Sequence, residues 1–286
     1  DLVIIKGRSF SDHWSVLDST RGANVLGTNL TDAQSSFSGW SFDSDGFTVG
    51  SSGQANSNGE THIGWGWKAN AGNTTSNGDG DITSTVQANQ TAGFSITTYV
   101  NNGNNQARVG HGLGTTPKVV LIKKYSVSAA WHFMTTAIDG SFDDLILNST
   151  SAKSNSSLTA PNDTTFAAES GGVGQSMVCY AFADVAGYQK FGSYSGTGSS
   201  LEVTVGFQPR FVVIRRVDSG DRWLVVDTFR GGNTNNDSFL DFQDTLSERN
   251  MNAINGLTFN SDSFTVNTTD GALNNSSGTY FYWAIA

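Results

Sequence analysis

One strand pattern is written three times in this sequence, which restricts the chain to folds built from similar units. Residues 2–22, LVIIKGRSFSDHWSVLDSTRG, align without a gap on residues 211–231, FVVIRRVDSGDRWLVVDTFRG. The two blocks share a tryptophan, an aspartate and an arginine at equal spacing: Trp14, Asp18 and Arg21, then Trp223, Asp227 and Arg230. A middle copy begins at Val119 and keeps its tryptophan, Trp131, but neither the aspartate nor the arginine. The middle copy is therefore the divergent one.

Two further blocks follow the first one in each copy. Residues 42–49, FDSDGFTV, recur as residues 259–266, FNSDSFTV, with a weaker echo around Phe166. An apolar run then closes each copy, at residues 63–67, 177–182 and 280–285. The repeat signature consists of Trp14, Asp18, Arg21, Phe47, Trp65, Trp131, Trp223, Asp227, Arg230, Phe264 and Trp283.

The blocks divide the chain into residues 1–90, 91–185 and 186–286. Matching segments that contain Gly, Phe, Tyr and Pro precede the second and third copies, at residues 93–117 and 187–209, and the first copy has none. We therefore expect the chain to begin within a repeat, with the two opening strands missing or supplied by another segment. A shifted division, in which the strands of residues 94–113 complete the first unit, fits the pattern equally well.

Composition favours an all-β chain. Charged residues make up 14%, there are 33 Gly, and Ser, Thr and Asn are abundant, which is typical of short strands joined by many turns. The 7 Trp and 18 Phe provide enough apolar surface for packed cores. We predict tandem small antiparallel β-sandwich units of jelly-roll-like type. The apolar runs at residues 3–5, 119–122 and 211–214 are continuous, so they should be central strands buried on both faces.

The charge balance excludes several partners. With 25 acidic and 16 basic residues, the net charge is -9, which disfavours a nucleic-acid backbone or an anionic lipid surface. No apolar stretch approaches the roughly 18 residues that a membrane span requires, so membrane insertion is not predicted, and no classical secretion signal opens the chain. A lone cysteine, Cys179, lies in an apolar run and is interpreted as a buried, inert thiol and not as a nucleophile.

Few residue patterns point to chemistry. The four histidines, His13, His62, His111 and His132, are scattered without metal-ligand spacing, and no G-x-S-x-G elbow occurs. Residues 77–81, NGDGD, begin like a calcium loop but lack its later Gly and Glu, so we predict no cofactor and leave calcium alone open. No catalytic or metal-binding residues are assigned. A glycan depolymerase needs only two carboxylates at the correct separation, which a sequence does not reveal.

The signature residues allow two interpretations. Trp14, Asp18 and Arg21 could form a carbohydrate subsite, with an aromatic plate beside a carboxylate. They could also form a core tryptophan and a turn-stabilising ion pair, which we favour because a feature repeated at fixed spacing defines a fold, whereas binding loops differ between copies.

Taken together, these blocks resemble a known repeat family. The DLVIIK strand, the W-x-V-x-D-x-x-R-G block, SFDSDGFTVG, the closing GWGW and YFYWA strands, and the GFSITTY and VGHGLGTTPK lead-in are similar to repeats of marine bacteriophage virion proteins. That family includes cyanophage and pelagiphage tail fibres and related appendages. The resemblance covers nearly the whole chain, with residues 69–90 least constrained, and no catalytic residue set accompanies it.

The resemblance implies a non-enzymatic structural or adhesive module, of tail-fibre type, in a virion or extracellular location. Its expected partners are other virion proteins and a host-surface glycan or protein. An architectural virion protein such as a capsid decoration, and a lectin-like carbohydrate-binding module, are the alternatives. A homotrimer would suit a fibre, but the three repeats could themselves supply a threefold arrangement within one chain.

Overall fold

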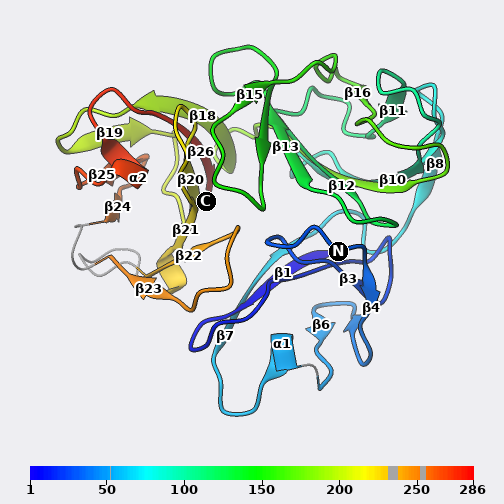
Figure 1. Cartoon of the computed structure of the whole chain (residues 1–286), viewed down its shortest axis with the longest axis horizontal. Helices are drawn as coiled ribbons and strands as arrows, with labels where there is room; N and C mark the ends of the chain where they lie inside the picture. The colour runs from blue at the N-terminus through cyan, green and yellow to red at the C-terminus, as the bar shows by residue number, and fades with distance from the viewer. Residues whose placement is uncertain (52, 231–237, 252–255) are drawn as a thin grey trace.

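The computed structural model describes residues 1–51, 53–230, 238–251 and 256–286 (Figure 1). Strands account for 42% of the chain and helices for 4%. Among these described residues every sheet consists of antiparallel pairs, and one isolated bridge, between Ile82 and Val109, is parallel. The prediction of an all-β chain with antiparallel sandwich architecture is therefore confirmed. No helix in the described ranges is long and apolar enough to cross a membrane.

The third unit consists of two sheets. Its large sheet runs, in spatial order, β18 (Gln189–Ser195), β26 (Thr279–Ile285), β20 (Phe211–Arg216), β21 (Trp223–Asp227), β22 (Ser238–Asp241) and β23 (Arg249–Asn250). A second sheet consists of β19 (Leu201–Thr204), β25 (Ser263–Val266) and β24 (Leu257–Phe259). A 3₁₀ helix, η1 (Thr228–Arg230), follows β21, and α2 (Gly271–Asn274) precedes β26. The apolar residues between the two sheets form a core of their own.

The second unit repeats this plan and extends it. Its large sheet runs β15 (Ser154–Asn155), β14 (Asp143–Ile146), β13 (Trp131–Thr135), β12 (Val119–Lys124), β17 (Ser176–Phe182), β10 (Phe94–Val100), β9 (Ser84–Asn89) and β8 (Thr75–Asn77). The smaller sheet pairs β11 (Arg108–Gly110) with β16 (Thr165–Ala167). The sequence predicts a linker at about residues 69–90, at the end of the first unit, whereas β8 and β9 in that stretch lengthen the sheet of the second unit.

The first unit is the smallest. Its main sheet contains β2 (Ser15–Asp18), β1 (Leu2–Gly7) and β7 (His62–Trp67), in that order. Two short hairpins accompany it, β3 (Asn24–Val25) with β4 (Ser35–Ser36) and β5 (Ser41–Phe42) with β6 (Phe47–Thr48), together with α1 (Gly53–Asn56). The lead-in strands β10 and β11 pair with β17 and β16, so the shifted division that would give them to the first unit does not occur.

The same register recurs in all three units. The central pair is β1 with β7, β12 with β17, and β20 with β26, and Leu2 opposite Trp67 corresponds to Val119 opposite Phe182 and Phe211 opposite Ile285. The three central strands β1, β12 and β20 are buried throughout, except for the last residue of β12 and of β20. This confirms the prediction from their continuous apolar runs, because alternate residues face the unit's own core and a core shared by all three units.

The shared core holds the three repeated tryptophans, each fully buried. Each indole N–H donates to a backbone carbonyl of a different unit: Trp14 to Asp241 at 3.1 Å, Trp131 to Gly27 at 2.8 Å, and Trp223 to Ile146 at 3.1 Å. The three acceptors occupy equivalent positions. Val16, Phe133 and Val225 each pair with a leucine, and the acceptor is the residue that follows this leucine in the sequence. The units are therefore joined in a closed cycle.

Backbone hydrogen bonds follow the same cycle. The bonds run from the N–H of Glu248 to Arg8 O at 2.8 Å, from Gln34 to Tyr125 O at 2.9 Å, and from Lys153 to Val217 O at 2.9 Å. Donors and acceptors again occupy equivalent positions in the three units. The three units of one chain thus form the threefold arrangement that was expected as the alternative to a homotrimer.

Candidate functional site

The signature tryptophans lie in the interior and not on a binding surface. All seven tryptophans of the chain fall in described residues, and none is classed as exposed. Trp65, the least buried, packs against Trp14 with ring centroids 5.8 Å apart, and the guanidinium of Arg230 lies 5.3 Å from its centroid. Trp283 stacks on Trp67 at 5.7 Å. A sugar-stacking plate made of these tryptophans is therefore not available, which favours the core interpretation.

The repeated aspartate and arginine form buried ion pairs at a turn. Arg21 Nε lies 2.5 Å from Asp18 Oδ2, and Arg230 Nε lies 2.6 Å from Asp227 Oδ2. Each arginine also contacts the preceding strand: Arg21 Nη2 donates to the carbonyl of Val16, and Arg230 Nη2 donates to that of Val225. The equivalent turns of the first and third units are thus stabilised by the same contacts.

These ion pairs also connect units. The phenol of Tyr180, from the second unit, donates to Asp18 Oδ2 at 2.6 Å. Burial is the main reason that the pKa of this phenol lies well above its ordinary value. In the third unit, Arg230 and Arg8 share the carboxylate of Glu248, at 3.2 Å and 2.8 Å, which joins that unit to the first. The divergent second unit has Thr135 and Ile138 at the corresponding positions.

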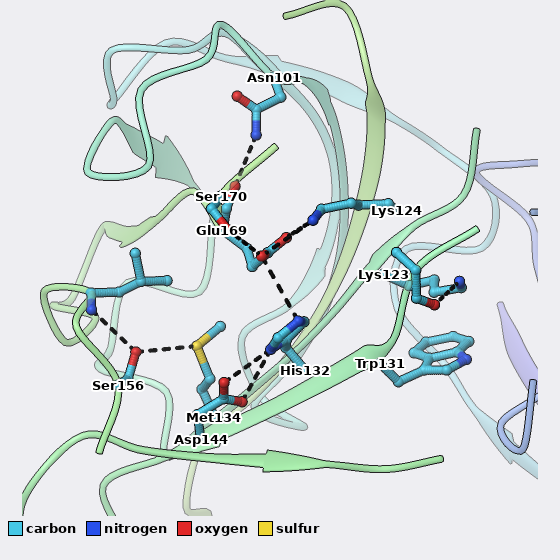
Figure 2. A network of polar contacts seen from close by, with 12 residues as sticks. Asn101, Lys123, Lys124, Trp131, His132, Met134, Asp144, Ser156, Glu169 and Ser170 are labelled. Carbon is cyan, nitrogen blue, oxygen red and sulfur yellow. Dashed lines mark hydrogen bonds and ion pairs between the residues drawn. The ribbon is translucent and has the colours of Figure 1, made fainter. Parts of the chain in front are cut away.

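Polar side chains gather on the second unit in a cluster that the sequence did not predict (Figure 2). His132 on β13 places Nδ1 3.0 Å from Asp144 Oδ2 on β14 and Nε2 3.8 Å from Glu169 Oε1. Lys124 Nζ on β12 lies 2.9 Å from the other oxygen of Glu169. Burial lowers the pKa of His132, but the hydrogen bond and charge of Asp144, with Glu169, outweigh it and raise that pKa above its ordinary value.

The charged groups of this cluster pair with one another. Ser170 donates its hydroxyl to Glu169 at 2.8 Å and not to His132, so the cluster lacks the serine–histidine contact of an activated nucleophile. Asn101 holds the backbone carbonyl of Glu169 at 2.8 Å. Among the described residues no group of His, Cys, Asp and Glu is arranged to hold a metal ion. We interpret the cluster as an ion-pair network that fixes the loop after β16 against the sheet.

Sequence spacing alone did not reveal this cluster. His132 and Asp144 meet because β13 and β14 pair with Ile146 opposite His132, which puts Asp144 diagonally across from the imidazole. Glu169 comes from a loop and carries no periodic signal. Only the pairing register of β13 with β14 could have indicated that His132 and Asp144 lie close together.

The remaining candidate residues lie apart. Cys179 lies within the core of the second unit, where burial raises the pKa of its thiol well above the ordinary value. Asp81, in the calcium-loop-like stretch, accepts the backbone N–H of Arg108 at 2.8 Å. The four histidines have different partners and are not brought together: for example, His13 contacts Asn29 and His111 contacts Asn162.

A hollow belongs to the first unit. It has a volume of about 690 Å³ and opens between the face of β1 and β7 and the hairpin β5–β6. Its apolar walls include Val3, Trp40, Phe42 and Phe47, and the turn of that hairpin contributes Asp43 and other residues. The sequence predicts that the first copy lacks the two lead-in strands, but no sequence motif marks the residues that line this hollow.

Comparison with protein families gives a match over the whole chain. A family model described as "Domain of unknown function (DUF7483)" matches residues 1–286. No curated protein and no solved structure matches the chain.

Proposed function

The chain belongs to the DUF7483 family, and we propose that it is a non-enzymatic structural and adhesive module of a bacteriophage particle, of tail-fibre type, whose loops contact a host surface. The attribution to a virus particle comes from the resemblance of its repeat blocks to those of marine phage appendages. The observation that carries the mechanical part of the proposal is the closed cycle of hydrogen bonds from Trp14, Trp131 and Trp223.

That cycle supports a scaffold role. The three repeated tryptophans are buried, and their indole N–H groups bond to other units. The Asp–Arg pairs are buried as well, so none of these polar groups is free for a ligand. A rigid body of this kind presents its loops at fixed positions, as binding scaffolds do. Contact with a host would then depend on residues that differ between the copies.

One such residue is Phe229, which is 85% exposed. It lies in the Asp–Arg turn of the third unit, two residues after Asp227, and Thr20 has the same place after Asp18 in the first unit. An exposed aromatic ring in one copy of an otherwise matching turn supports a contact that belongs to that copy alone.

The test is competition for adsorption. Purified protein is added to host cells before phage, and the adsorbed fraction is measured against protein concentration. We expect inhibition by the unaltered protein and a rise of at least about tenfold in the concentration for half inhibition after Phe229→Thr, which gives the third unit the residue of the first.

Thr20→Ala is the matched control, since it alters the equivalent turn and should leave inhibition unchanged. Absence of both inhibition and cell binding by the unaltered protein contradicts the adhesive role. Turnover of host polysaccharide that is lost on substitution of a carboxylate contradicts the non-enzymatic assignment.

An architectural virion role is the second candidate. The hollow in the first unit favours it, because an incomplete sandwich suits a site for a neighbouring polypeptide. Electron cryomicroscopy that finds these repeats on the head of the particle and not on the tail would favour this candidate over the first.

A further inference from the structure

In the part of the chain that the structure describes, strand β7 has one pairing partner, whereas its counterparts have two. In the second unit β17 lies between β12 and β10, and in the third unit β26 lies between β20 and β18. Within the described residues, β7 pairs with β1 only, so its opposite edge is free of strands.

The hydrogen-bonding groups on that edge can be identified from the register. Paired residues of an antiparallel ladder alternate between hydrogen-bonded and non-bonded pairs. Arg8 N–H donates to Thr61 O on the β1 side, so the N–H and C=O groups of His62, Gly64 and Gly66 point to the other edge. In the second unit, the equivalent groups are those of Met177, Cys179 and Ala181, whose partner strand is β10.

The smaller sheet of the first unit is incomplete in the same way. Phe166 and Phe264 each lie opposite a valine of a lead-in strand, Val109 in β11 and Val203 in β19, and both phenylalanines are fully buried. Phe47 has the same place in its hairpin, but no strand of the described residues lies on that side, and it is 39% exposed.

The hollow lies where the other two units hold their lead-in segments. In those units the core between the sheets includes lead-in side chains, Tyr99, Val109 and Leu113 in the second unit and Val203, Val205 and Phe207 in the third. The first unit has about 690 Å³ of open volume between its two sheets. Trp40, which lines that volume, has a buried Nε1 without a hydrogen-bond partner.

We propose that the first unit binds an extended polypeptide segment with the chemistry of a lead-in, which is not among residues 1–286. Its first strand pairs antiparallel with β7, and its second strand pairs with β6 and covers Phe47. The ligand is a polypeptide because the free edge offers backbone donors and acceptors at strand spacing, which another backbone satisfies in register. This inference does not depend on the proposed attachment role.

Side-chain sizes identify the segment more closely. Tyr99 and Tyr194 lie opposite Met177 and Tyr280, which correspond to His62. Gly64 and Gly66 take the places of Tyr282 and Ala284, so the first unit leaves more room beneath the added strand than the third. The fitting segment therefore carries an aromatic residue near His62 and apolar residues opposite Phe47.

The experiment uses a synthetic peptide with the sequence of residues 188–209, added to the full chain. Amide hydrogen exchange is followed for His62, Gly64 and Gly66, with Met177, Cys179 and Ala181 as internal references that are already paired. We expect the first three amides to exchange rapidly without peptide and at least about tenfold more slowly at saturating peptide, since a ladder hydrogen bond protects an amide.

Two variants serve as controls. Gly64→Pro removes an N–H that does not pair with β1, which an edge strand tolerates, and should abolish binding while the references stay protected. A peptide with Gly192→Pro should fail on the unaltered protein. The proposal is overturned if saturating peptide leaves the three amides unprotected, if they are already protected by self-association of the chain, or if Gly64→Pro binds as well as the unaltered protein.

Discussion

Three buried cations occupy the same position in the three units. Lys6, Lys123 and Arg215 are each 0% exposed, and each donates to a backbone carbonyl of a neighbouring unit, namely Thr245, Thr31 and Ser151. Burial lowers the pKa of Lys6 and of Lys123 to about 8. A base was evident in each strand of the sequence, but its burial was not, because long basic side chains usually lie exposed.

Replacing Lys6 should change how stability depends on pH. Above pH 8 the folded state releases the Lys6 proton, while the unfolded state keeps it up to a pKa of about 10.5, so the free energy of unfolding rises with pH in that interval. Lys6→Met removes this contribution, and its unfolding free energy should rise less between pH 8 and 9.5. Urea denaturation across that range measures it.

The control for this prediction is Lys68→Met, a substitution at an exposed lysine, which should follow the unaltered protein. If the unfolding free energies of the Lys6 variant and the unaltered protein change with pH in parallel, the pKa of Lys6 is the same in the folded and unfolded states, which contradicts the prediction.

At the scale of elements, two hairpins with one sequence pattern meet different surroundings. Phe42 pairs with Phe47 in the first unit as Phe259 pairs with Phe264 in the third. Phe264 also has β19 beside it, whereas no described strand takes that place beside Phe47. The sequence showed that this block recurs but not that its burial differs, since burial depends on strands from elsewhere in the chain.

The two phenylalanines should differ in their contribution to stability. Phe264→Ala leaves a cavity in a closed core and should lower the free energy of unfolding by about 3–5 kcal/mol. Phe47→Ala should change it by less than about 1 kcal/mol, because that ring is already partly solvated. Urea denaturation of both variants provides the comparison, and equal losses would mean that Phe47 is covered in solution.

Much of each element was predictable, and the exceptions have physical causes. Strand positions, the central strands and the Asp18–Arg21 turn follow from local pattern, because alternation and turn residues act over short distances. The pairing of β8 and β9 with the second unit, and the cluster of His132 with Glu169, depend on register between distant segments. The sequence contains no local signal for that register.

At the scale of the whole molecule, the units should unfold together. They share one apolar core and a cycle of tryptophan hydrogen bonds, so loss of one unit exposes the surfaces of the other two. We expect a single calorimetric transition. Trp131→Phe, which deletes the bond to Gly27, should lower the unfolding free energy by about 1–3 kcal/mol without splitting the transition.

Trp14→Phe and Trp223→Phe are its counterparts in the other units and should behave alike. Separate transitions in the unaltered protein, or a variant that melts one unit alone, would contradict the joint unfolding.

The closed cycle also has an evolutionary consequence. In an assembly of three identical subunits, every mutation is copied onto all three, so a specialised feature must be tolerated in triplicate. In this chain each of the three units has its own sequence, so a mutation changes one unit only. One third can therefore acquire the charged network around His132, another the protruding ring of Phe229, and the remaining one an unfilled groove, while the tryptophans hold their common geometry.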